Sequence, residues 1–490
     1  MGFLTVPRCL ISMRGTNQSV KKVLAVDLDF SLARTDALIE SMWSMFVSHP
    51  FRFLKTILNL RRGKAFFKNR VAESTSFDAA KLPFNTEVIK QIKSWKNSGG
   101  KVVLVTASHQ TIADQVGKHL DLFDQVKGSN ESTNLKGPEK AKFLCEEFGS
   151  GQFAYIGDSR ADLSVWEEAC SVIAVNPSIG LKFQLENRFN DVKYLLSSES
   201  KLIEFLRLMR PTQWVKNTLV FAPIVAAQSR DLSSLLNNAF AFIIFCLVAS
   251  AVYILNDAFD LQNDRNHPIK KQRPLASGSV QISEGLALSA VLFILGLTLS
   301  LWIDMQLFWL MSLYVILNVL YSATFKKVRF VDVFFLALFF MSRILAGSIT
   351  GNVDLTFVFL AFSGCLFLTL GSIKRLGELI LFSNAKMDRI PGRGYRSKDT
   401  AYLQLIAAAS SIVSIACLAS YINSESVLEI YKTPDFLWGI VLILTGWIIR
   451  LIVLTMKGKS HDPLKFSLQD KGSILALFFC VALILTATLI

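Results

Sequence analysis

The residues of this chain best suited to chemistry lie between Asn256 and Gly278. Asp257, Asp260 and Asp264 are spaced three and four apart, so on a helix they share one face and repel one another. Such a group needs a cation, and Mg²⁺ carrying phosphates is the natural candidate. Because an apolar run long enough for a bilayer comes directly before it, the segment predicts an Mg²⁺-dependent diphosphate site at a membrane surface. The basic residues that follow are Arg265, His267, Lys270, Lys271 and Arg273.

Other polar side chains stand in or beside the apolar runs of the C-terminal half. Asp332 and Arg343 lie within one run, where a charge is costly and marks a functional candidate. They are three helical turns apart, so both can face one interior, although Arg343 could instead form a structural pair with a neighbour. The remaining candidate substrate contacts are Gln213, Lys216, Asn217, Asn256, Lys270, Arg273, Tyr321, Lys326, Lys374 and Arg375.

The N-terminal part carries a second set of carboxylates. The run VLAV is typical of a buried parallel strand and leads directly into Asp27 and Asp29. A similar run, FAYI, leads into the sequence GDSRAD. The candidate residues here are Asp27, Asp29, Thr106, Lys136, Asp158 and Asp162.

Composition divides the chain in two. Hydrophobic residues make up 52% of it, but residues 1–200 mix charged and apolar side chains, whereas long apolar runs begin after about residue 215. We therefore expect an N-terminal extension at 1–20 without a signal peptide, a soluble domain at 21–205 and a membrane domain at 206–490.

The soluble domain is predicted to have an α/β, Rossmann-like fold. Strand-like runs at 101–106, 153–157 and 172–175 accompany VLAV, and helical patterns such as 86–97 and 138–148 lie between them. Residues 34–80 interrupt the alternation with a mostly helical insertion rich in Phe and basic residues, which suits an anionic membrane surface or an ordinary amphipathic cap.

The membrane domain is predicted to be an all-α bundle of about nine helices. Lys and Arg gather in alternate loops, which places the soluble domain in the cytoplasm and, with an odd count, the C-terminus outside. This distribution also accounts for the net charge of +14 without nucleic acid, and the seven cysteines predict neither disulfides nor a zinc site. The predicted spans are 216–229, 234–255, 283–303, 305–322, 331–349, 355–373, 401–422, 436–456 and 472–490.

Over residues 205–490 the chain resembles the UbiA prenyltransferase superfamily. The resemblance rests on the apolar span followed by Asn256-Asp257-x-x-Asp260-x-x-x-Asp264 and HPxKxxRPLASG. It implies that the carboxylates hold Mg²⁺ and that the metal holds a diphosphate. Many members carry a second motif, DxxxD, but here Asp332 is followed by Leu336 at the position of the second Asp.

RPTQWVKN, KRxxE and HDPLKF, with the lone Asp332, are similar to the decaprenyl-phosphate phosphoribosyltransferase branch of that superfamily. This resemblance implies phosphoribosyl diphosphate as donor and a polyprenyl phosphate as acceptor, in a bacterial inner membrane. The first alternative is a prenyltransferase with a prenyl diphosphate donor, against which Leu336 argues. The second is a non-enzymatic membrane carrier. The sequence does not reveal the oligomeric state.

The soluble domain resembles the haloacid dehalogenase (HAD) phosphatases, with 34–80 as the cap. By this resemblance Asp27 is the nucleophile and Asp29 the acid–base, Thr106 and Lys136 hold phosphoryl oxygens, and Asp158 binds Mg²⁺. Asp162 supports Asp158, and Asp27 and Asp29 are counted with them as metal-site residues. We therefore expect the chain to transfer a 5-phosphoribosyl group and then to remove its 5-phosphate.

Overall fold

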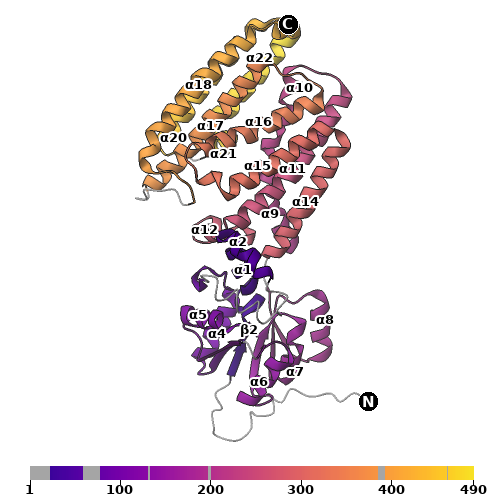
Figure 1. The fold of residues 1–490 in the computed structure, drawn as a ribbon, viewed down its shortest axis with the longest axis vertical. Coiled ribbons are helices and arrows are strands. Elements are labelled where there is room, and N and C mark those ends of the chain that lie inside the picture. The colour runs from indigo at the N-terminus through magenta and orange to yellow at the C-terminus, as the bar shows by residue number, and fades with distance from the viewer. Residues whose placement is uncertain (1–22, 59–77, 131–132, 197–199, 385–391, 461) are drawn as a thin grey trace. The chain divides into compact units, whose positions relative to one another are not determined.

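The computed structural model describes residues 23–58, 78–130, 133–196, 200–384, 392–460 and 462–490 (Figure 1). They form two compact units. The first contains the chain up to Leu208 and also Asp264–Gly285, and the second contains Met209–Asn263 and Leu286–Ile490. The predicted extension at 1–20, and the part of the predicted cap at 59–77, lie outside the described residues.

The first unit is built on a six-stranded sheet in the order β3-β2-β1-β4-β5-β6, and every pairing is parallel. This confirms the predicted α/β fold with a parallel sheet. Side chains alternate between the faces of a strand, so Leu24 and Val26 enter one hydrophobic core and Val23 and Ala25 enter the other. The strands are β1 Val23–Val26, β2 Lys101–His109, β3 Gln125–Ser129, β4 Phe153–Gly157, β5 Ser171–Val175 and β6 Val192–Leu195.

Helices cover both faces of this sheet (Figure 1). Helices α4 (Thr86–Asn97) and α5 (Gln110–Leu120) contribute to one core, and α6 (Pro138–Phe148), α7 (Leu163–Glu168) and α8 (Ile179–Arg188) contribute to the other. The helices predicted at 86–97 and 138–148 are confirmed, and Pro138 begins α6 as expected. The unit also contains α1 Ala37–Ser48, α2 Pro50–Leu58, α9 Lys201–Met209, α13 Pro274–Ser277 and the 3₁₀ turns Ala79–Lys81, Arg160–Asp162 and Lys270–Gln272.

The second unit contains eight helices that are long and apolar enough to cross a membrane, counted among the described residues. They coincide with eight of the predicted spans. These helices are α11 Leu232–Phe259, α14 Ile282–Ile303, α15 Met305–Ala323, α16 Val331–Gly351, α17 Phe357–Asn384, α18 Thr400–Ile422, α20 Trp438–Met456 and α22 Lys471–Leu489. Shorter elements of the C-terminal half are α12 Leu261–Arg265, α19 Glu425–Ile430, α21 Pro463–Gln469 and the 3₁₀ turns Phe325–Lys327, Ser397–Asp399 and Pro434–Leu437.

The ninth predicted span, 216–229, is not a long helix. A 3₁₀ helix, Pro211–Phe221, leads into the five-residue helix α10, Ala222–Ala226. The segment nevertheless runs along the bundle, because the indole of Trp214 donates to Ser250 whereas the backbone of Val220 accepts from Asn238. A 3₁₀ helix rises about 2.0 Å per residue, so this short segment covers more length than an α-helix of equal size.

A glycine of α16 permits this packing. A Cβ atom built on Gly347 would collide with the backbone carbonyl of Val220, so only glycine lets the two backbones approach so closely. We expect Gly347→Ala to lower the stability of the purified protein by roughly 1–3 kcal/mol, the usual cost of overpacking. The matched control is Gly446→Ala in α20, where an added Cβ meets nothing within 4 Å. Equal thermal midpoints for the two variants would contradict the prediction.

Two candidate active sites

The first candidate site lies where the sheet order reverses direction. Strands β1 and β4 are neighbours in the middle of the sheet, and the chain proceeds outward from them to opposite edges. In open α/β sheets, ligands bind at the carboxyl ends of the strands beside such a reversal. Asp27 directly follows β1 and Asp158 directly follows β4. Two elements distant in sequence therefore bring these carboxylates together.

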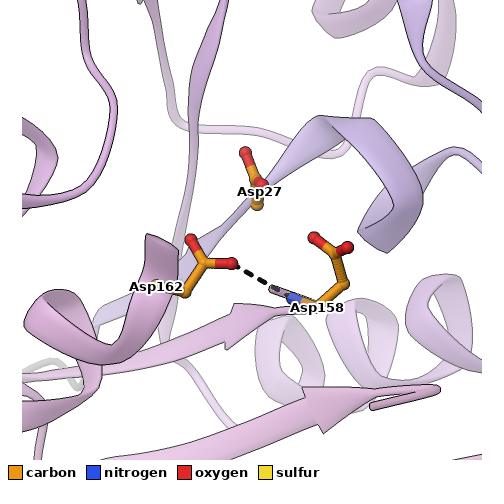
Figure 2. A group of neighbouring side chains, drawn as sticks. All are labelled: Asp27, Asp158 and Asp162. Carbon is orange, nitrogen blue, oxygen red and sulfur yellow. Dashed lines mark hydrogen bonds between the residues drawn. The ribbon is translucent and has the colours of Figure 1, made fainter. Parts of the chain in front are cut away.

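Asp27, Asp158 and Asp162 offer oxygen atoms that all lie within 4.8 Å of one another (Figure 2). Oxygen-only donors at this spacing fit a hard cation such as Mg²⁺. Asp162 also accepts from the backbone amide of Asp158 at 3.2 Å and from the amide and hydroxyl of Ser159 at 3.0 and 2.9 Å. It therefore fixes the loop that presents Asp158.

Lys140 is the lysine of this site. Its Nζ lies 2.8 Å from Oδ1 of Asp27, 2.9 Å from the hydroxyl of Tyr155 and 3.8 Å from Asp162. The sequence prediction named Lys136, but that residue is exposed before α6 begins. Lys140 lies on the buried face of α6, and it is Lys140 rather than Lys136 that contacts Asp27.

Asp29 occupies a different environment from Asp27. The backbone follows Asp27 in a wide turn, with Ala33 N donating to Leu28 O at 2.8 Å. Asp29 then accepts from the hydroxyl of Ser108 at 2.7 Å and from the amide of Ala37 at 2.8 Å. These contacts hold the Asp29 carboxyl in a fixed orientation, as a proton-transferring group requires.

The buried Thr106 fixes the position of Ser108. The hydroxyl oxygen of Thr106 accepts from the backbone amide of Ser108 at 3.0 Å. Because Ser108 in turn donates to Asp29, Thr106 is connected through one residue to that carboxyl. Strand β2 thereby places Thr106 near Asp29, and its predicted contact with phosphoryl oxygens stays a prediction.

Burial raises the pKa of three carboxyl groups of this site, those of Asp27, Asp29 and Asp158. The pKa rises to about 6 for Asp27, where Lys140 opposes the effect of burial, and to about 7 for Asp29. For Asp158 burial and the neighbouring Asp27 raise the pKa to about 8. A carboxyl such as Asp29 that keeps its proton near neutral pH can act as a general acid. The crowding of the other two is relieved by a bound cation.

The raised pKa of Asp158 predicts that the free energy of unfolding depends on pH. Between its ordinary pKa of 3.8 and about 8 the folded chain holds a proton that the unfolded chain releases, so stability falls as pH rises through this window. Without divalent cations at pH 8, Asp158→Asn should raise the thermal midpoint by about 3–6 °C, the shift that roughly 1–2 kcal/mol produces. This rise in the thermal midpoint should be smaller at pH 5. Added Mg²⁺ should stabilise the wild type but not Asp158→Asn.

Asp121→Asn is the control for that measurement, because Asp121 has a left-handed backbone (φ 50°) that Asn also tolerates. A lower midpoint for Asp158→Asn than for this control, in metal-free buffer at pH 8, would contradict the predicted repulsion.

The second candidate site is at the C-terminal end of α11. Asp257 forms an ion pair with Arg210, and Asp260 with Lys326 at 2.6 Å. Carboxylates at the C-terminus of a helix face the negative end of its dipole, so they require cations nearby. Asn256 accepts from Ser322 at 3.2 Å. Oxygen atoms of this kind are ligands that Mg²⁺ prefers, and in this structure basic side chains compensate both carboxylates.

Asp264 and Arg273 belong to the segment Asp264–Gly285, which packs with the first unit. Within it, Arg273 donates to Asp264 at 2.6 Å. Lys270 is exposed in the same segment. The prediction that the three carboxylates share one helix face is therefore wrong, because α11 ends at Phe259 and Asp264 lies in the separate short helix α12.

Asp332 lies at the start of α16 and is fully buried among cationic and phenolic donors. Arg375 approaches it at 2.6 Å, Arg393 at 3.2 Å and the hydroxyl of Tyr395 at 2.6 Å. The phenol of Tyr321 accepts from both arginines, at 3.2 and 2.6 Å. Asp332 therefore has its charge compensated by protein groups.

Arg343 forms part of a different network from Asp332. Its guanidinium donates to Asn217 at 2.9 Å and to the hydroxyl of Tyr314 at 3.3 Å. It also lies over the ring of Phe245, 5.2 Å from the centroid. These contacts favour a structural role for Arg343 and Asn217.

The other predicted contacts of the second unit are less enclosed. Lys374 forms an ion pair with Asp462 at 3.3 Å, and both side chains are partly exposed. Gln213 and Lys216 are half-buried on the 3₁₀ helix. His461, which was noted beside Asp462, lies outside the described residues.

Several residues of the two sites were not predicted. Arg210 opens the motif RPTQWVKN, so its sequence position was a usable signal, but Arg393 and Tyr395 lie in a polar loop without periodicity. Lys140 could have been found by its helical spacing from the buried Leu144. The missed residues are Ser108, Lys140, Arg210, Arg393 and Tyr395.

Comparison with known proteins identifies the family. Residues 218–468 match the UbiA prenyltransferase family. The Uncharacterized protein y4nM of Sinorhizobium fredii is 32% identical over 472 residues, which cover 94% of this chain and 91% of that protein. The decaprenyl-phosphate phosphoribosyltransferase of Corynebacterium glutamicum is 31% identical over 294 residues, which cover 57% of this chain and 85% of that enzyme.

A UbiA homologue from Archaeoglobus fulgidus, solved with DMAPP and Mg²⁺, is 16% identical and has a TM-score of 0.43 over 57% of this chain and 99% of that chain. The family match covers more than half of the chain and includes most of its long apolar helices. The chain therefore belongs to the UbiA prenyltransferase family, as a multi-pass membrane transferase.

Proposed function

We propose that the membrane unit moves a 5-phosphoribosyl group from phosphoribosyl diphosphate to a polyprenyl phosphate. The observation that best supports this proposal is that protein groups compensate the charge of Asp332. Two arginines and a tyrosine compensate its charge, and Leu336 stands at the position of the second Asp of the DxxxD motif, so that motif supplies only one acid here. Glu378 pairs with the same Arg375 at 2.6 Å, so its charge is compensated as well. A ribosyl donor brings one diphosphate, whereas the lipid acceptor brings only a monophosphate, which basic residues can bind.

The proposed transfer needs no strong base, because the lipid phosphate is already ionised. One of its oxygens forms a bond to the anomeric carbon while the bond from that carbon to the diphosphate breaks, and the diphosphate leaves with the electron pair. Asn256, Asp257 and Asp260 would hold Mg²⁺, which supplies charge neutralisation for the leaving group. Arg210 and Lys326 orient these carboxylates and present positive charge beside them.

We further propose that the first unit hydrolyses the 5-phosphate of that product. Asp27 attacks phosphorus, the bond to the ribose oxygen breaks, and Asp29 donates its proton to that oxygen. Asp29 then takes a proton from water as that water attacks phosphorus, the bond between Asp27 and phosphorus breaks, and inorganic phosphate leaves. Lys140 and Thr106 hold the phosphoryl oxygens in this scheme, and Asp27, Asp158 and Asp162 would hold Mg²⁺, which would neutralise charge on the phosphoryl group.

Helix α2 supports access to a lipid-linked substrate. Phe51 and Leu54 expose 81% and 60% of their surface, and Arg52 and Lys55 lie on the same helix. Exposed apolar residues with cations suit an anionic lipid surface. In this proposal the first unit faces the cytoplasm of a bacterial cell, next to its inner membrane, and the C-terminus lies outside.

Donor labelling tests the proposal. Purified protein in lipid nanodiscs receives polyprenyl phosphate with either labelled phosphoribosyl diphosphate or labelled prenyl diphosphate. We expect label in the lipid product from the ribosyl donor only, and release of both diphosphate and inorganic phosphate. Label from the prenyl donor would support the alternative prenyltransferase, and no label from either donor would support the carrier.

A further inference from the structure

A buried ion pair connects α1 to the segment that follows the Asp-rich motif. Arg265 donates to both oxygens of Glu40, at 3.0 Å and 2.5 Å. Their side chains expose only 6% and 4% of their surface, and both residues belong to the first unit. Removing one partner of such a pair leaves a buried charge without compensation, which is strongly unfavourable.

The same segment has two more attachments within the first unit. Gly278, with φ of 72°, lies so close to Arg34 that a Cβ atom would come 2.8 Å from its side chain. The hydroxyl of Ser279 donates to Glu204. Arg265 also donates to the carbonyl of Ala276 at 3.1 Å, which closes the segment on itself. The segment is thus held at both ends.

Helix α1 is also the helix that contacts the phosphatase-like site. The amide of Ala37 donates to Asp29 at 2.8 Å, and one turn later Glu40 receives Arg265. Thr35 donates to Glu40 at 2.9 Å and orients it further. A single helical turn therefore contacts both the acidic site and the segment that begins at Asp264.

We propose that Glu40 is a positioning residue for the transferase. Through Arg265 it fixes the segment that carries Asp264, the last carboxylate of the Asp-rich motif, and Arg273. This inference rests on the proposed diphosphate chemistry of the motif.

The test compares Glu40→Gln with Glu87→Gln in the full chain. Glu87 forms an exposed ion pair with Lys90 at 2.8 Å, so it controls for the substitution itself. In Glu40→Gln we expect amide hydrogen exchange across 264–285 to be about tenfold faster, because the local opening free energy falls. The KM for the diphosphate donor should rise roughly tenfold while kcat changes by less than about twofold.

A double-mutant cycle shows whether the pair acts as a unit. Glu40→Gln combined with Arg265→Gln should cost no more than the worse single variant. Additive effects, or wild-type exchange in Glu40→Gln, would overturn the proposal. Should Glu40→Gln fail to fold, Glu40→Asp replaces it, because Asp keeps the charge but has a shorter side chain. Wild-type hydrogen exchange and wild-type KM in Glu40→Asp would also overturn the proposal. If the wild type labels lipid from neither donor, the proposed function is refuted. Hydrogen exchange across 264–285 then still tests whether Glu40 fixes this segment.

Discussion

Asp27→Asn should reduce the release of inorganic phosphate by about 10³-fold or more, because an amide cannot form the covalent phosphoryl intermediate. The substitution preserves shape, and the amide oxygen can still accept from Lys140, whose Nζ lies 2.8 Å from the carboxylate. Release of diphosphate should stay within about twofold of the wild type, since Asp27 takes no part in the proposed transfer. The measurement supplies phosphoribosyl diphosphate and polyprenyl phosphate and quantifies both products.

The control is Asp78→Asn. The Asp78 side chain caps the 3₁₀ turn Ala79–Lys81 by accepting from the amide of Ala80. Asn caps such turns about as well as Asp, so both products should remain at wild-type levels. If Asp27→Asn released phosphate at the rate of this control, the phosphatase assignment would be wrong. Loss of both products together would mean instead that Asp27 maintains the fold.

The sequence predicted the central strands of the sheet but not its edges. VLAV and FAYIG are continuous apolar runs because β1 and β4 are buried on both faces. Strand β3 contains the polar residues of QVKGS, and β6 is only half-buried, so neither has the apolar signal of a central strand. Both were missed for this physical reason.

The first of the predicted spans shows a different limit. Apolar composition predicted a span at 216–229, and composition does not distinguish a 3₁₀ helix from an α-helix. What permits this segment is a tertiary contact, the close approach of Val220 to Gly347. A glycine in α16 has no visible link to residue 220 in the sequence alone.

Some site residues were likewise visible in the sequence, and others depend on contacts that only the fold makes. Asp27 and Asp158 were predictable because each follows a recognisable strand. The environment of Asp332 was not, because Arg393 and Tyr395 reach it from a loop more than sixty residues away. The missing acid at Leu336 was visible in the sequence, whereas the groups that compensate Asp332 are visible only in the structure.

Asp257→Asn should abolish lipid labelling from either donor, with a loss of about 10³-fold or more, because the proposed cation loses a charged ligand. Asp257 is 2% exposed at the end of α11, where Arg210 is its ion-pair partner. The control is Asp231→Asn at the other end of the same helix, where Asp231 caps the amide of Ser234 and Asn caps equally well. Labelling by this control should match the wild type.

A comparison with Arg210→Gln separates a cation site from a purely structural ion pair. If Asp257 served only to anchor Arg210, the two single variants would lose the same amount of activity and the double variant no more. If the carboxylate holds the cation, Asp257→Asn should cost far more than Arg210→Gln. It should also raise the Mg²⁺ concentration needed for half-maximal labelling, by about tenfold or more, since a neutral amide binds the ion weakly. Unchanged labelling in Asp257→Asn would defeat the metal-site argument.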